Sequence, residues 1–345
     1  MASGVLTEAI DRVASRENLP REDAAAVLAE IMAGNATDIQ IAAFLIALRT
    51  KGETEDELAG LAQTMRRLAT PVRPQREDLV DTAGTGGGRR TFNVSTTAAL
   101  IAAGAGCAVA KHGNRSATGL SGSADVLEAL GARLDVPPEG IARQIDEAGF
   151  GFMFAPAHHA ATRYVVPVRK ELAVRTIFNL LGPLTNPAGA RRQVVGVADP
   201  GVLDLVAGAL ARLGTDRALV VSSADGLDEL STSGPTHVVE VEGEQLTRYV
   251  VEPESVGLGR CEPGDVAGGT PEDNAAATRA ILAGESGPRS DLALLNAGAA
   301  IYAGGRAESI ADGVTRAREA IASGAARASL DHYVALSAEL AEPAR

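Results

Sequence analysis

Residues 81–96, which read DTAGTGGGRRTFNVST, combine a glycine-rich turn with two arginines and a cluster of serine and threonine. The turn follows a short β-like run at 79–82 and precedes a helical stretch at 95–104. The N–H groups of a glycine loop and of a helix N-terminus bind phosphate through hydrogen bonds and the helix dipole. This pattern favours a phosphate-binding loop, and an ordinary glycine-rich turn is the alternative.

Two common phosphate-binding motifs are excluded by the letters of this loop. The dinucleotide motif G-x-G-x-x-G would need glycine at position 89, where the chain has Arg89. The P-loop motif needs G-K followed by serine or threonine, and this loop contains no such sequence. NAD-dependent redox chemistry and ATP hydrolysis therefore lose their main support.

A second polar cluster follows the next β-like run, in the sequence AKHGNRSATGLSGSADVLEALG. Lys111, His112, Asn114 and Arg115 supply hydrogen-bond donors beside a Gly/Ser-rich turn. A donor-rich loop that faces the glycine loop from a neighbouring strand would bind a molecule with several phosphates. A solvated charged turn is the alternative.

A pair of adjacent acids, Asp228 and Glu229, follows the β-like run ALVVSS. Neighbouring carboxylates hold Mg²⁺ through oxygen atoms and water, and the ion commonly bridges them to substrate phosphates. Surface acids are the alternative without a phosphate site nearby. Arg169 is a separate candidate, because the forked donors of arginine suit a planar carboxylate, with a surface salt bridge as its alternative.

The bulk composition excludes several other classes of protein. The formal net charge of −12 disfavours a broad nucleic-acid-binding surface. Cys107 and Cys261 form no CxxC pair, which argues against a zinc site or a disulfide scaffold. The first 30 residues lack an apolar signal region, and no uncharged apolar run reaches the roughly 18 residues of a membrane span. We therefore expect a cytoplasmic protein.

The elements that must position these clusters change in character along the chain. Residues 1–70 show helical periodicity and predict four short helices, and Thr37 with Gln40 and Thr54 with Glu57 have the spacing of capping boxes. Beyond the linker at 70–74, β-like runs alternate with helical stretches, which predicts a mostly parallel sheet with helices on its faces. The predicted strands are 79–82, 107–110, 150–154, 193–198, 218–223 and 237–241. The segment 165–190 fits neither pattern, and 252–270 is predicted to be a surface excursion.

The four clusters together resemble the anthranilate phosphoribosyltransferase family, whose motifs occur here in the same order. The family patterns are G-T-G-G-D-G-x-x-T-F-N-[IV]-S-T, K-H-G-N-R-x-x-[ST]-[SG]-x-x-G-S-A-D-x-L-E-x-L-G, P-V-R-x-E-L-x-x-R-T-x-F-N-L-L-G-P-L-x-N-P and a paired D-E. Their counterparts are Gly84–Thr96, Lys111–Gly131, Pro167–Pro187 and Asp228 with Glu229. The likeness covers nearly the whole chain.

The resemblance implies an α/β fold, with a small N-terminal helical domain and a larger α/β domain that has a mostly parallel central sheet flanked by helices. The helical domain would comprise 1–72, joined by about 165–190, and the α/β domain would comprise 75–345. A homodimer through the helical domain is also implied, and this accounts for the segment that leaves the sheet.

The resemblance further implies a Mg²⁺-dependent reaction of tryptophan biosynthesis, with two ions per subunit. The amine of anthranilate displaces pyrophosphate from 5-phosphoribosyl 1-diphosphate (PRPP) and gives N-(5′-phosphoribosyl)anthranilate. Lys111 and the metal would stabilise the leaving group. No general base is assigned: His112 or His159 could accept a proton, or serve a structural or orienting role.

The family's site residues carry over to matching positions. The positions that match PRPP-binding residues are Gly84, Gly87, Gly88, Thr91, Asn93, Val94, Ser95, Thr96, Lys111, His112, Gly113, Asn114, Arg115, Ser116, Ala117, Thr118, Gly119 and Ser123. The positions that match metal-binding residues are Ser95, Asp228 and Glu229. The positions that match anthranilate-binding residues are Gly84, Asn114 and Arg169.

The glycine loop departs from the family pattern. GTGGGRRT is one residue shorter than G-T-G-G-D-G-x-x-T and lacks its aspartate, which weakens the assignment of Gly88. Arg89 and Arg90 could add phosphate contacts or face solvent. Two other functions stay open at this point: a pyrimidine nucleoside phosphorylase-like enzyme, and a non-catalytic paralogue that binds nucleic acid. The first would need no bridging Mg²⁺, and the second would need a basic face.

Overall fold

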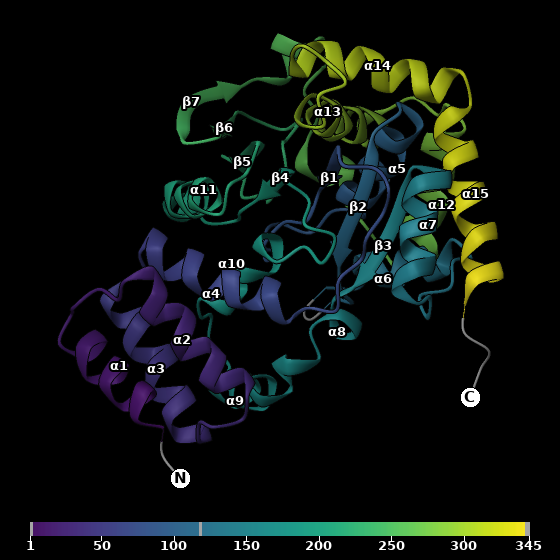
Figure 1. The fold of residues 1–345 in the computed structure, drawn as a ribbon. Helices are drawn as coiled ribbons and strands as arrows, with labels where there is room; N and C mark the ends of the chain where they lie inside the picture. The colour runs from purple at the N-terminus through teal and green to yellow at the C-terminus, as the bar shows by residue number, and fades with distance from the viewer. Residues whose placement is uncertain (1–2, 117–118, 342–345) are drawn as a thin grey trace.

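The computed structural model describes residues 3–116 and 119–341, and it forms a small helical domain beside a larger α/β domain (Figure 1). The helices of the small domain are α1 (Gly4–Ala14), α2 (Arg21–Met32), α3 (Asp38–Lys51) and α4 (Glu55–Leu68). The predicted capping boxes are confirmed, with Thr37 and Gln40 at the start of α3 and Thr54 and Glu57 at the start of α4. Reciprocal hydrogen bonds of this kind satisfy orphan N–H groups and define where a helix begins.

The α/β domain contains a seven-stranded sheet in the order β3-β2-β1-β4-β5-β6-β7. The strands are β1 (Leu79–Asp81), β2 (Ala108–Gly113), β3 (Phe150–Phe154), β4 (Arg192–Gly196), β5 (Arg217–Ser223), β6 (Thr236–Glu242) and β7 (Gln245–Val251). The first five strands in this order are parallel, and β6 and β7 add an antiparallel edge. All six predicted strands are confirmed. The sequence did not predict β7, because this edge strand is mostly exposed and its apolar run, 249–251, is confined to its end.

Helices cover both faces of the sheet. They are α5 (Val94–Gly104), α6 (Ser123–Ala129), α7 (Pro138–Ala148), α11 (Leu203–Arg212), α12 (Pro271–Leu282), α13 (Pro288–Ala303), α14 (Ile310–Ala322) and α15 (Ala325–Leu340). Side chains of a strand alternate between the two faces. On β5, Leu219 and Val221 join the apolar cluster of α5, α13 and α15, whereas Ala218 and Val220 join the cluster of α11 and the small domain.

The segment that fitted neither pattern leaves the sheet and folds into short helices, chiefly α9 (Val166–Leu172) and α10 (Phe178–Leu181). Helix α9 contacts α3, and α10 contacts α4. This segment and the N-terminal helices share one apolar cluster, which continues onto β4, β5 and α11. None of the helices within the described residues is long and apolar enough to cross a membrane.

Candidate active site

The glycine loop, residues 84–91, connects β1 to α5 at the carboxyl end of the parallel strands, the usual place for a ligand in such sheets. The N–H of Thr85 donates to the carbonyl of Gly196 at the end of β4, at 2.8 Å. Gly87 has φ +91°, a conformation that favours glycine. A Cβ atom on Gly88 would lie 2.4 Å from Oδ1 of Asp228, so the loop packs tightly against the paired acids.

Asp228 and Glu229 lie on the loop between β5 and β6, and they face the glycine loop. Besides the larger effect of burial, the N–H groups of Gly88 and Gly86 act to lower the pKa of Asp228, and the N–H of Ser95 acts to lower that of Glu229. Burial and the neighbouring charge of Asp228 raise the pKa of Glu229 to about 8, against the opposing effect of Lys111. Burial likewise raises the pKa of Asp228. The pair would be stabilised by a cation.

These carboxylates share a small pocket with the glycine loop and the start of α5. Its lining residues are Thr82, Gly84, Ser95, Ala98, Val194, Gly196, Asp228, Glu229 and Asn296. Carboxylate and hydroxyl oxygens are ligands that suit Mg²⁺. Within residues 3–116 and 119–341, no group of three His, Cys, Asp or Glu side chains is placed to hold a metal. The two carboxylates and the hydroxyl of Ser95 fit an ion that takes its remaining ligands from water and substrate phosphates.

Lys111 lies beneath this pocket and does not line it. Its side chain is almost wholly buried, and Nζ donates to Oγ1 of Thr82 at 3.0 Å. Burial lowers the pKa of Lys111, whereas the negative charges of Asp81 and Glu229 oppose that shift. A buried ammonium group at this position contributes positive potential to the site without being open to solvent.

The loop after β2 holds the rest of the predicted donors. The guanidinium of Arg115 pairs with Asp125 at 2.9 Å and with Glu128 at 2.5 Å, so it is held by α6. Asn114 uses Oδ1 to accept the N–H of Arg115. Ser116 accepts the N–H of Gly119. Two of the predicted PRPP-binding positions, Ala117 and Thr118, lie outside the described residues.

The starts of α5 and α6 are joined by side chains. Asn93, the residue before α5, donates to the carbonyl of Ser121 at 3.2 Å and accepts from the hydroxyl of Ser121 and the amide of Asn274. Helix α6 begins at Ser123. Oγ1 of Thr96 is buried and has no hydrogen-bond partner among the described residues. The two helix N-termini therefore lie close together, as a site for several phosphates requires.

His112 and His159 pack edge to face behind the loop after β2, with ring centroids 5.1 Å apart. Burial and the nearby His159 lower the pKa of His112 to about 3, and burial lowers the pKa of His159 to about 4. Both rings are therefore neutral at pH 7. Nδ1 of His112 lies 3.1 Å from the carbonyl of Gly182, which leaves Nε2 as an acceptor.

Arg169 lies on α9, away from the sheet. Its guanidinium stacks over Phe178 at 5.4 Å and reaches Oδ1 of Asn179 only at 3.5 Å. Arg175, on the same segment, was not predicted as a site residue, although it lies in the R-T-x-F-N motif. Its Nη2 donates to the carbonyl of Gly87 at 3.3 Å, so this segment touches the glycine loop directly.

Asp81 is a site residue that the sequence reasoning missed. This fully buried carboxylate at the end of β1 accepts the N–H groups of Ala83 and His112, each at 3.1 Å, and the amide of Asn186 at 2.8 Å. It thus joins the starts of both loops to the segment that packs on the helical domain. An acid at the carboxyl end of a buried parallel strand was the available signal.

Asn296 and Gly196 were also missed. Asn296, on the apolar helix α13, accepts the N–H of Leu230 and donates to its carbonyl, which fixes the chain immediately after Glu229. A Cβ atom on Gly196 would lie 1.6 Å from the carbonyl oxygen of Asp228, so only glycine lets the backbones meet there. Two features of the sequence could have indicated these residues: Asn296 is a lone asparagine in an apolar helix, and Gly196 is a glycine at the end of a strand.

Two domain families match the chain, the helical bundle domain of a glycosyl transferase family at residues 7–69 and its a/b domain at residues 76–327. Anthranilate phosphoribosyltransferase of Moorella thermoacetica is 50% identical over 332 residues, covering 96% of this chain and 98% of that protein. The same enzyme of Chloroflexus aggregans is 52% identical over 335 residues, covering 96% and 98%. The chain belongs to the anthranilate phosphoribosyltransferase family.

Solved structures of anthranilate phosphoribosyltransferases share the fold. The enzyme of Thermus thermophilus superimposes with a TM-score of 0.91 at 48% identity, covering 96% of this chain and 99% of that one. The enzyme of Saccharomyces cerevisiae, solved in complex with PRPP and Mg, gives a TM-score of 0.89 at 27% identity, covering 98% and 99%. The resemblance inferred from the motifs is confirmed.

Proposed function

We propose that the protein transfers the 5-phosphoribosyl group of PRPP to the amine of anthranilate and releases pyrophosphate. One observation carries the proposal: Asp228, Glu229 and Ser95 line the same pocket as Gly84 of the glycine loop. That pocket offers oxygen ligands for Mg²⁺ beside N–H groups for phosphate. The family and the yeast relative solved with PRPP and Mg support it. The relatives favour this activity over a pyrimidine nucleoside phosphorylase.

PRPP is assigned to the glycine loop, the N-termini of α5 and α6, and the loop after β2. Mg²⁺, when bound by Asp228, Glu229 and Ser95, supplies charge that stabilises the leaving pyrophosphate. The buried ammonium of Lys111 adds positive potential from below the pocket. We also propose two Mg²⁺ ions per subunit, because the two carboxylates and the two phosphate groups of the diphosphate offer ligands for both ions.

Anthranilate is assigned to Arg169, Asn114 and Gly84. The fork of Arg169 would pair with the carboxylate, and this orients the amine toward the ribosyl carbon. An aryl amine is neutral at pH 7 and the ribosyl centre is oxocarbenium-like, so positioning matters more than activation. The neutral rings of His112 and His159 lie behind the second loop, and we assign neither as a general base.

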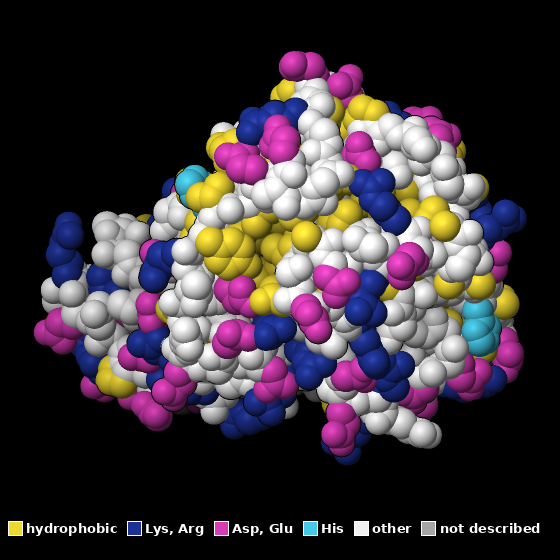
Figure 2. Space-filling model, turned by 90° about the horizontal axis from the view of Figure 1, so that it is seen from above, with side chains coloured by type: hydrophobic (Ala, Val, Ile, Leu, Met, Phe, Trp, Pro, Cys, Tyr) yellow, Lys and Arg dark blue, Asp and Glu magenta, His cyan; other side chains and the backbone are white. Residues whose placement is uncertain are grey.

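The charge distribution supports small substrates over nucleic acid. On the face in Figure 2, lysine and arginine side chains are interspersed with aspartate and glutamate. A net charge of −12 adds to the repulsion of a polyanion. We also propose that the enzyme is cytoplasmic, and that its domains comprise 1–72 plus about 165–190, and 75–345.

Anthranilate fluorescence provides the direct test of the activity. It should fall when PRPP and Mg²⁺ are both added, and it should stay constant when either is omitted or when the metal is chelated. A fall that survives full chelation would contradict the metal assignment. No fall at any pH at which the protein stays folded would overturn the function. Phosphorolysis of uridine or thymidine, measured in parallel, would instead support the nucleoside phosphorylase.

We also propose a homodimer through the helical domain. Ile39 on α3 is 82% exposed, and the apolar side chains of Val5 on α1 and Val166 on α9 are about half exposed. These helices lie at the end of the molecule away from the sheet (Figure 1). Such residues are common at the core of an interface. Sedimentation equilibrium should give twice the 35.2 kDa chain mass. Ile39→Lys should lower that mass to one chain, and a monomeric wild type would refute the dimer.

A further inference from the structure

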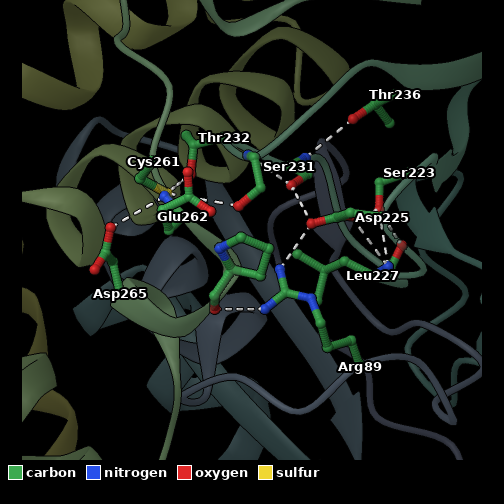
Figure 3. Close-up of polar contacts among 12 residues, drawn as sticks. Arg89, Ser223, Asp225, Leu227, Ser231, Thr232, Thr236, Cys261, Glu262 and Asp265 are labelled. Atoms are coloured by element: carbon green, nitrogen blue, oxygen red, sulfur yellow. Dashed lines mark hydrogen bonds and ion pairs between the residues drawn. The ribbon is translucent and has the colours of Figure 1, made fainter.

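Arg89 lies in the glycine loop that lacks the aspartate of the family pattern, and its side chain is mostly buried against neighbouring segments. It turns away from the loop and reaches two other segments (Figure 3). Nη2 donates to Oδ2 of Asp225 at 2.7 Å, and Nη1 donates to the carbonyl of Pro263 at 2.7 Å. The backbone N–H of Arg89 donates to the carbonyl of Gly226 at 2.8 Å.

Asp225 is itself held firmly on the loop between β5 and β6. Its carboxylate accepts the hydroxyls of Ser223 and Ser231, which stand on either side of the paired acids. Although burial raises the pKa of Asp225, hydrogen bonds from Ser223, Arg89 and Ser231 bring it below its ordinary value. The ion pair with Arg89 is only 13–23% exposed, so solvent screens it less than a surface pair.

The ion pair therefore joins two loops that must act together. One loop offers N–H groups to phosphate, and the other carries Asp228 and Glu229 three and four residues beyond Asp225. The segment expected to be a surface excursion takes part as well, because Pro263 anchors the guanidinium and Val266 accepts the N–H of Phe92 at 3.4 Å. The glycine loop lacks the aspartate of the family and is one residue shorter. It is nevertheless held by contacts with the loop between β5 and β6 and with the segment around Pro263.

We propose that Arg89 is a positioning residue whose ion pair with Asp225 sets the spacing between the glycine loop and the metal-binding carboxylates. This inference rests on the proposed function, because the spacing matters for PRPP bound with Mg²⁺. Displacement of reacting groups by about an ångström lowers rates by up to a hundredfold. Arg89 acts through Asp225 and does not need to touch the substrate.

The test compares Arg89→Ala, Asp225→Asn and the double variant in steady-state kinetics. Each single variant should raise the KM for PRPP and the half-saturating Mg²⁺ concentration about tenfold, while the KM for anthranilate stays within about twofold. The double variant should resemble either single variant, because two groups that act through one contact are not additive. Arg89→Lys should recover part of the loss, because it keeps the charge. Arg248→Ala removes an exposed pair with Asp204 and should match the wild type.

Two results would overturn the inference. If Arg89→Ala weakens PRPP binding and Asp225→Asn does not, the guanidinium contacts pyrophosphate directly. If neither changes the PRPP or Mg²⁺ constants, the ion pair does not set the spacing. A general loss of structure would lower the melting temperature and change the KM for PRPP, the half-saturating Mg²⁺ concentration and the KM for anthranilate together. The conservative variants Arg89→Lys and Asp225→Asn distinguish such a loss from a positioning effect. Inactivity of the wild type with PRPP and anthranilate would refute the proposed function instead.

Discussion

Replacing Asp228 with asparagine, or Glu229 with glutamine, should lower kcat/KM by about a hundredfold or more at saturating Mg²⁺. Both carboxylates line the pocket that Gly84 of the glycine loop and Ser95 at the start of α5 also line. An amide keeps the shape of the side chain but loses the charge that holds the ion. Isothermal titration with Mg²⁺ and PRPP should show that the variants lose metal-dependent binding. Asp331→Asn, an exposed acid on α15, is the matched control.

The pH dependence of the wild type adds a second readout to this prediction. Since burial and Asp228 raise the pKa of Glu229 to about 8, a proton competes with Mg²⁺ for this carboxylate near pH 7. Mg²⁺ must displace that proton, so the apparent affinity for Mg²⁺ should rise as pH increases to about 8 and then level off. The side chain of Gln in Glu229→Gln has no proton to lose. The part of the pH dependence of Mg²⁺ affinity that comes from Glu229 should therefore disappear in this variant. An equal slope in wild type and variant would contradict the assignment.

Measurements of stability show whether the loss of activity in Glu229→Gln is caused by unfolding. A carboxyl whose pKa is raised in the folded state contributes stability at low pH, and that contribution is lost as pH rises through the folded pKa. Without Mg²⁺ at pH 8 and above, Glu229→Gln should therefore unfold at a temperature no lower than the wild type. A large drop in melting temperature would mean that the activity loss is structural.

The parts of the fold that the sequence predicted are those set by local pattern. Apolar runs predicted six strands, and the side chains of Thr37 and Thr54 predicted the starts of α3 and α4. Strand β7 was missed because it is a mostly exposed edge strand, defined by its pairing with β6. The glycine loop and the paired acids were predicted because the type of each residue limits what it can bind.

The partners of buried polar groups could not be predicted, because they depend on which segments the fold brings together. Asp81 meets Asn186 across 105 positions of the chain, and Arg89 meets Asp225 across 136. Loop letters alone gave Arg89 two possible environments, phosphate or solvent, and the structure gives it a third. The sequence indicated a role for Lys111 at the phosphate site, but it could not predict the burial of this side chain, which depends on the packing of β1 against β2.

Replacing Arg169 with alanine should raise the KM for anthranilate about tenfold to a hundredfold and leave the KM for PRPP nearly unchanged. The guanidinium is half-buried over Phe178, and its one long contact to Asn179 leaves the fork able to pair with a carboxylate. Arg169→Lys keeps the charge but loses the paired donors, so it should recover only part of the affinity. Lys170→Ala changes an exposed cation on the same helix and serves as the matched control.

The same variants distinguish a carboxylate contact from a general effect on the segment. Because Arg175 touches the glycine loop from this segment, a disturbed segment would raise the KM for PRPP as well. Aniline, which lacks the carboxylate, provides the sharper comparison: its weak turnover should be the same in the wild type and in Arg169→Ala. A change confined to the PRPP constant, or an equal loss with aniline, would contradict the carboxylate role of Arg169.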